Sequence, residues 1–203
     1  MHLILITPDT KVNNEAQIIN SLFANGLQRL HVRKPGFSYD EYKEYISNID
    51  AQYHERVVVC GAFELYSEMG LGGVHLNSHI RDDAAVWTQI KNIPLAHIST
   101  SFHSWQEVRG NERQYGYVFI SPVFDSISKA SYKAAIDLQQ CAVVRQEVVT
   151  VRGYCPQIIG LGGVGVPQVP VLQQNGFDGA ALLGSVWGAE DAVGAFLDIA
   201  KWL

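Results

Sequence analysis

Eight short strand-like runs, each followed by a segment of helical periodicity, place the strongest constraint on how this chain can fold. Such alternation is typical of βα units that build a parallel sheet. Runs such as 57–59 and 158–159 are apolar on consecutive residues, as expected of strands covered on both faces. The predicted strands are residues 3–7, 29–33, 56–60, 73–76, 95–99, 117–121, 157–161 and 179–183.

The even spacing of these units favours a closed barrel over an open sheet. There is no long insertion and no glycine-rich turn after the first run, so an open doubly wound sheet is the second choice. We therefore predict an α/β fold, a single (β/α)8 TIM barrel over residues 1–203. Apolar residues at helical spacing in 189–203 predict a last helix that completes the outer ring.

Charge and composition limit the class of partner. The chain carries 15 Lys and Arg against 20 Asp and Glu, a net charge of −5, which argues against a nucleic-acid surface and favours a small molecule. No stretch approaches the roughly 20 apolar residues of a membrane span, and residues 1–8 resemble a strand more than a secretory signal. The 3 cysteines lack metal-ligand spacing, which favours reduced thiols and a cytoplasmic location. Aromatic residues in the helical segments permit a homodimer.

The turns after the last two predicted strands have the composition of a phosphate site. Gly162-Gly163-Val164 and Gly184-Ser185-Val186 follow these strands, and TIM barrels carry their ligands at this end. Bare backbone N–H groups at a helix start stabilise an anion by hydrogen bonding and by the helix dipole. The alternative is that the glycines only allow close strand–helix packing.

Cations and hydroxyls after two other strands would complete such a pocket. Arg33 follows the second strand, and Ser126, Ser128 and Lys129 follow the sixth. The guanidinium and ammonium groups would balance phosphate charge, and the hydroxyls would donate hydrogen bonds. Arg33 could instead form a structural ion pair, and a lysine in a long loop is by default solvated.

Four motifs in the chain are similar to those of one known family. They are residues 31–35 (His-Val-Arg-Lys-Pro), 73–76 (Gly-Val-His-Leu), 99–104 (Ser-Thr-Ser-Phe-His-Ser) and 121–129 (Ser-Pro-Val-Phe-Asp-Ser-Ile-Ser-Lys). Together with the glycine turns they resemble the thiamine phosphate synthase/TenI family over nearly the full length. In the last motif, serine replaces the family's threonine twice, which keeps both hydroxyls.

The resemblance implies a transferase that joins hydroxymethylpyrimidine diphosphate to thiazole phosphate, with pyrophosphate leaving and magnesium holding it. By matching positions, Arg33, Ser101, Ser126, Ser128 and Lys129 would contact the diphosphate and pyrimidine, and Gly163, Gly184 and Ser185 the thiazole phosphate. Lys34, His103 and Gly162 are further substrate-binding candidates. The catalytic candidates are His31, Arg33 and Lys129.

The chain departs from the family where the family's synthases hold magnesium. Their Asn-Asp pair aligns with Cys60-Gly61, and a further aspartate falls near His79-Ile80. Magnesium prefers hard oxygen ligands, which Cys60, Gly61 and Ile80 do not supply. We therefore name no metal ligand, and magnesium is the expected cofactor only for the synthase function.

The family's thiazole tautomerases also lack the magnesium ligands, and they use a histidine where Pro122 stands here. A proton shuttle would then fall to His31, His79 or His103 if their imidazoles face the barrel mouth. His31 and Arg33 share one face of a strand, so we expect both in the mouth, with the guanidinium lowering the pKa of His31. Three functions remain open: a transferase, a proton-transfer isomerase and a non-catalytic phosphate binder.

Overall fold

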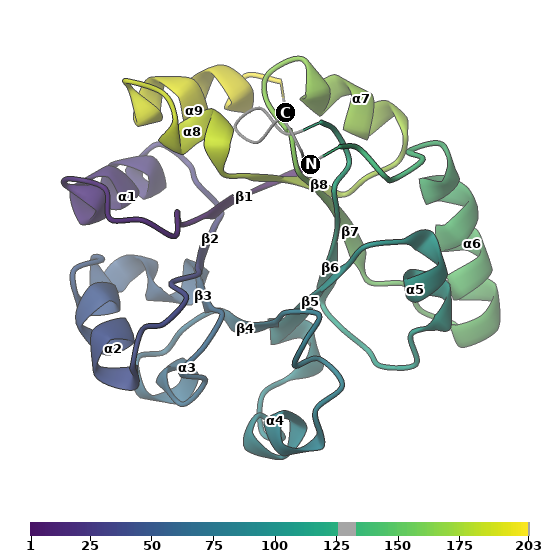
Figure 1. Ribbon diagram of the computed structural model, residues 1–203, viewed down its shortest axis with the longest axis horizontal. Coiled ribbons are helices and arrows are strands. Elements are labelled where there is room, and N and C mark those ends of the chain that lie inside the picture. Colours follow the sequence, from purple (N-terminus) through teal and green to yellow (C-terminus); the bar gives the residue numbers. More distant parts are fainter. Residues whose placement is uncertain (126–132, 203) are drawn as a thin grey trace.

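Eight parallel strands close into a barrel, and helices surround it (Figure 1). The computed structural model describes residues 1–125 and 133–202. The strands pair in sequence order, and β1 also pairs with β8, so the predicted TIM barrel is confirmed and the open sheet is wrong. The strands are β1 His2–Ile6, β2 Arg29–Val32, β3 Val57–Val59, β4 Gly73–Leu76, β5 Ile98–Phe102, β6 Tyr117–Ile120, β7 Gln157–Leu161 and β8 Gly179–Leu182.

The helices that cover the barrel vary widely in length. The longest, α6, has 13 residues, whereas α3 and α8 are single turns of 4 residues. None of the helices in the described residues is long and apolar enough to cross a membrane. The α-helices are α1 Glu15–Ala24, α2 Tyr39–Ser47, α3 Leu65–Glu68, α4 Ala84–Gln89, α5 Trp105–Gly110, α6 Gln140–Arg152, α7 Gln168–Gln174, α8 Gly184–Trp187 and α9 Ala192–Ala200.

The fifth strand begins later than the sequence predicts. Residues 95–97, predicted as strand, form the short 3-10 helix η2 (Leu95–His97), and β5 starts at Ile98. Pairing with both neighbours sets this register, since Ser99 lies opposite His75 on one side and Tyr117 on the other. An apolar run does not by itself show at which residue the strand begins. The shift places Ser101 within the strand instead of in the loop after it.

The hydrophobic core has two parts, one between the strands and the helices and a smaller one inside the barrel. Successive side chains of a strand point to opposite faces, so strands β1, β6, β7 and β8 contribute to both parts. The interior cluster consists of Ile4, Ile6, Tyr117, Phe119, Ile159 and Ala181.

Two histidines stand inside the barrel next to this cluster. The Nε2 atom of His31 and the hydroxyl of Tyr117 are hydrogen-bonded at 2.5 Å. His75 is paired on both nitrogens, at 2.9 Å to the hydroxyls of Ser99 and Ser101. Hydroxyl groups thus satisfy both nitrogens of His75, as expected of a structural histidine.

Both imidazoles are neutral at physiological pH. Burial lowers the pKa of His31 well below its usual value, with smaller contributions from His75 and Arg29. Burial, assisted by Arg33, lowers the pKa of His75 to about 3. The expected direction for His31 is therefore right, but its main cause is burial and not the neighbouring guanidinium.

The first prediction concerns the Tyr117 hydroxyl. Tyr117→Phe leaves the buried Nε2 of His31 without a partner, which should lower the free energy of unfolding by about 1–3 kcal/mol. As a control, Tyr39→Phe removes a hydroxyl that is hydrogen-bonded to Glu68 at the surface. This variant should change the free energy of unfolding by less than about 0.5 kcal/mol. Urea unfolding followed by circular dichroism measures both. Equal losses in the two variants would contradict a special role for the interior pair.

Candidate functional site

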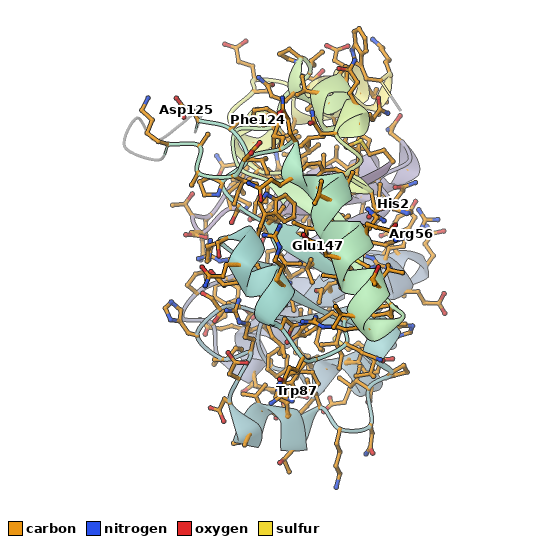
Figure 2. The ribbon with its side chains drawn as sticks, turned by 90° about the vertical axis from the view of Figure 1, so that its right-hand side faces the viewer. His2, Arg56, Trp87, Phe124, Asp125 and Glu147 are labelled. Atoms are coloured by element: carbon orange, nitrogen blue, oxygen red, sulfur yellow. The ribbon has the colours of Figure 1, made fainter. Side chains whose placement is uncertain are left out.

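The predicted site residues follow the carboxyl ends of the strands, and these ends meet at one end of the barrel. Phe124 and Asp125, which follow β6, mark that end in Figure 2, and His2 and Arg56, which begin or precede strands, mark the other. We call the first end the mouth and the second the floor.

The turn after β7 lies against the loop after β6. The amides of Val123 and Phe124 donate to the carbonyls of Leu161 and Gly162 at 3.0 and 3.1 Å. Gly162 and Gly163 have φ angles of 103° and 66°, and a Cβ atom on Gly163 would lie 2.2 Å from the carbonyl oxygen of Asp125. Both backbone conformation and space therefore require glycine at residue 163.

Asp125 holds the base of the loop that carries three predicted site residues. Its carboxylate accepts hydrogen bonds from Lys133 Nζ at 3.0 Å and from the Ala134 amide at 2.8 Å. The candidates between these anchors, Ser126, Ser128 and Lys129, lie outside the described residues, and their roles stay predictions. Asp125, directly before them, is in contact with the Gly163 turn.

The turn after β8 places further amides at the mouth. Gly184 and Ser185 begin α8, and the indole of Trp187 in that helix donates to the carbonyl of Ile6 at 2.8 Å. Among the described residues, no hydrogen bond uses the amide of Gly163, Gly184 or Ser185 as donor. Three backbone N–H groups, in the turns that follow the neighbouring strands β7 and β8, are thus available to donate hydrogen bonds to an anion.

Arg33 supplies the cation of the mouth. Its backbone is fixed to the end of β1, because its amide donates to Thr7 Oγ1 at 2.9 Å and the Thr7 hydroxyl donates back to its carbonyl at 3.1 Å. Its side chain is 50% exposed and pairs with the equally exposed carboxylate of Asp9. The guanidinium is therefore accessible, and its ion pair is one that solvent or a ligand can replace.

Lys34 does not join Arg33 in the mouth, which corrects the expectation that it contacts substrate. Its side chain is buried, and its ammonium donates to both carboxylate oxygens of Glu15 in α1 at 2.8 and 3.0 Å, and to the Pro8 carbonyl at 2.8 Å. Tyr45 in α2 donates to the same carboxylate at 2.6 Å. These partners hold the ammonium inside the protein.

The histidine candidates divide between the mouth and the interior. His103 is exposed after β5, with its Nδ1 atom 3.2 Å from the Ser121 carbonyl oxygen, and His79 is exposed after β4. His31 is only 1% exposed, so the expectation that it faces the mouth is wrong. Ser101 lies at the upper end of β5, half-buried, with its hydroxyl on His75.

The residues after β3 do not fit a magnesium ion. A Cβ atom on Gly61 would meet the ring of Tyr42 at 3.2–3.3 Å, so a carboxylate side chain there would require this ring to shift. Burial raises the pKa of the Cys60 thiol to about 12, which keeps it protonated. No group of three potential ligands is found in residues 1–125 and 133–202.

The nearest carboxylates in the sequence are engaged elsewhere. Asp9 pairs with Arg33, Asp82 lies 3.5 Å from Arg81, and Asp83 accepts the Ala85 amide at 2.7 Å to cap α4. Among the described residues of the predicted site, the mouth therefore offers backbone amides and the guanidinium of Arg33, groups that suit an anion better than a metal ion.

Residues 3–186 match the model of the family described as thiamine monophosphate synthase. The chain belongs to this family. A thiamine-phosphate synthase of Lysinibacillus sphaericus is 23% identical over 160 residues, which is 77% of this chain and 70% of the relative. One of Syntrophomonas wolfei is 30% identical over 98 residues, 48% of this chain and 44% of the relative.

Solved structures agree with the fold and the family. A thiamine phosphate pyrophosphorylase from Bacteroides thetaiotaomicron superimposes with a TM-score of 0.75 at 28% identity, covering 100% of this chain and 97% of the other. One from Pyrococcus furiosus reaches a TM-score of 0.77 at 18% identity over 99% and 94%, a likeness of fold alone.

Sequence reasoning missed Glu15, Tyr42 and Tyr117, which decide where the predicted site residues lie. Glu15 and Tyr42 stand at helix positions where a carboxylate or a phenol is common, so no local signal distinguishes them. Tyr117 begins an apolar strand, and its polar group becomes visible only when β2 and β6 face each other across the barrel.

The second prediction concerns the buried Lys34–Glu15 pair. Glu15→Ala leaves an uncompensated buried ammonium and should cost about 3–5 kcal/mol of stability. The double variant Lys34→Met, Glu15→Leu removes both charges and should recover most of that loss, measured by chemical denaturation. A double variant as unstable as Glu15→Ala, or a folded one that no longer binds inorganic pyrophosphate, would contradict the structural role of Lys34.

Proposed function

We propose that this chain is a transferase of the thiamine phosphate synthase type, whose mouth binds thiazole phosphate and a pyrimidine diphosphate. The observation that carries the proposal is the pair of turns after β7 and β8, with free amides at Gly163, Gly184 and Ser185, in a chain of this family. These amides would hold the thiazole phosphate, and Arg33 would face the diphosphate.

The reaction places clear demands on such a mouth. The thiazole nitrogen donates its lone pair to the pyrimidine methylene carbon, and the carbon–oxygen bond to the diphosphate breaks with its electron pair leaving on pyrophosphate. Arg33 would stabilise the departing negative charge, and fixed amides would orient the nucleophile. Of the other predicted contacts, Ser101 would approach the pyrimidine from β5, whereas Ser126, Ser128 and Lys129 stay predictions for the diphosphate.

The reaction we propose does not pass through a magnesium ion held by residues 60 and 61, because Tyr42 packs against Gly61 and the Cys60 thiol stays protonated. With Lys34 also held by Glu15, fewer charges oppose the departing diphosphate. We therefore expect slow turnover.

An isomerase that transfers a proton on a thiazole phosphate is the second candidate, and the exposed imidazole of His103 supports it. The same phosphate site would serve it, with His103 in place of the enclosed His31 as acid or base. A non-catalytic binder needs the phosphate site alone.

The third prediction tests the phosphate site, which all three functions share. Ser185→Asp places a carboxylate at the start of α8 and should weaken binding of thiazole phosphate at least about tenfold by repulsion. Asparagine has the size of aspartate but carries no charge, so Ser185→Asn is the matched control. It should weaken binding of thiazole phosphate much less. Calorimetry measures both. Equal affinities in the two variants would place the phosphate elsewhere.

Ser185 is a better place for this test than Gly163, where any side chain would meet the Asp125 backbone. A loss of binding in Gly163→Asp would report on that collision as well as on charge. Circular dichroism of both Ser185 variants confirms that the comparison is between folded proteins.

The fourth prediction tests the transferase. Purified protein with both substrates should form thiamine phosphate slowly, at a rate that changes less than about twofold when magnesium is replaced by a chelator, because the family's carboxylates are absent. Arg33→Gln should slow the reaction about 10-fold or more, whereas Arg33→Lys keeps the charge and should slow it less.

Fast, magnesium-dependent product formation would overturn this account and mean that Asp9, Asp82 or Asp83 holds the ion. No product in either buffer, with thiazole phosphate still bound, would exclude the transferase. Loss of tautomerase turnover in His103→Gln would then favour the isomerase, and no turnover of either kind would leave the binder.

A further inference from the structure

A cavity opens at the floor, the opposite end of the barrel from the mouth. Its volume is about 430 Å³. The lining residues come from the starts of strands and the segments before them, the end of the barrel marked by His2 and Arg56 in Figure 2. They include Arg29, Leu95, Gln114, Tyr117, Tyr154 and Gln157.

The charge of this floor cavity is positive, although the chain as a whole is negative. Arg29 is half-buried, its guanidinium carbon lies 5.0 Å from the centre of the Tyr117 ring, and it forms no ion pair within the described part of the chain. No Asp or Glu of residues 1–125 or 133–202 lines the cavity. A partly desolvated guanidinium without a carboxylate is complementary to an anion.

The other walls supply hydrogen bonds and apolar surface. The side-chain amides of Gln114 and Gln157 can donate to the oxygens of an anion. Leu95 and Tyr154, which line the same cavity, are 46% and 36% exposed and are among the large apolar side chains that the fold leaves uncovered. The cavity therefore offers a charged anchor beside an apolar wall.

We propose that the floor cavity binds a small organic anion, a carboxylate or phosphate carried on an aromatic or apolar body, with Arg29 as its anchor. The anionic group faces Arg29 and the two glutamine amides, and the body packs on Leu95 and Tyr154. This site is separate from the mouth and independent of the reaction there.

Tyr117 connects the floor cavity to the barrel interior. The ring of Tyr117 lines the cavity, and its hydroxyl is the hydrogen-bond partner of His31. An anion on Arg29 therefore lies next to the interior histidines, so the imidazole signals of His31 provide a second readout of binding besides the cavity itself.

The experiment uses benzoate and phenyl phosphate as probes, with benzyl alcohol as the neutral counterpart. Cys155 lines the cavity, so its alkylation by N-ethylmaleimide, followed by peptide mass spectrometry, reports occupancy at this place. We expect both anions to slow labelling of Cys155 at least threefold, saturably in the millimolar range, and to shift the His31 signals in NMR spectra. Benzyl alcohol should do neither. Cys141, which is buried and does not line the cavity, is the internal control.

Three variants separate the floor from the mouth. Arg29→Gln should raise the anion concentration needed for half-maximal protection at least about tenfold. Leu95→Asp, a change at an exposed side chain, should raise it as well, by repulsion and without risk to the core. Val143→Asp, at a 54% exposed residue of α6 that is not in the lining, is the matched control and should bind like the parent. Arg33→Gln should leave floor binding unchanged.

Protection by the anions no greater than that by benzyl alcohol would overturn the proposal. So would equal protection in the parent, Arg29→Gln and Leu95→Asp. Protection by benzoate alone would assign the site to carboxylates, and protection by phenyl phosphate alone would assign it to phosphate esters.

Discussion

The turn of Gly162 and Gly163 packs so closely on the backbone of Phe124 and Asp125 that no side chain fits at residue 163. The geometry of the mouth depends on this contact. It joins the loop after β6 to the end of β7, and it leaves the Gly163 amide free of intramolecular partners in the described residues. A phosphate bound there would touch two loops at once, which is how a barrel brings groups from different strands to one substrate.

Where the chain departs from the family motifs, neighbouring side chains pack against the changed residues or pair with them. Tyr42 stands in the space above Gly61, and Glu15 with Tyr45 holds the ammonium of Lys34. Restoring a carboxylate at residue 61 would therefore require moving Tyr42. The anion binding that we propose for the mouth therefore rests on backbone amides and on Arg33.

Apolar runs predicted the barrel, because strand and helix patterns are local features of the sequence, whereas the phosphate role of the glycine turns stays a prediction. The residues that the sequence misplaced depend on partners far along the chain. His31 meets Tyr117, 86 residues away, and a buried pairing of this kind leaves no mark on the residues around it. The start of β5 was missed for the same reason, since neighbouring strands and not its own sequence set its register.

A crystal structure grown with thiazole phosphate, pyrophosphate and manganese as an anomalous substitute for magnesium tests the central claim most directly. The account predicts phosphate density on the amides of Gly163, Gly184 and Ser185, pyrophosphate beside Arg33, and no anomalous peak next to Cys60 and Gly61. A manganese peak held by Asp9, Asp82 or Asp83 with pyrophosphate bound to it, or a phosphate away from the β7 and β8 turns, would contradict it.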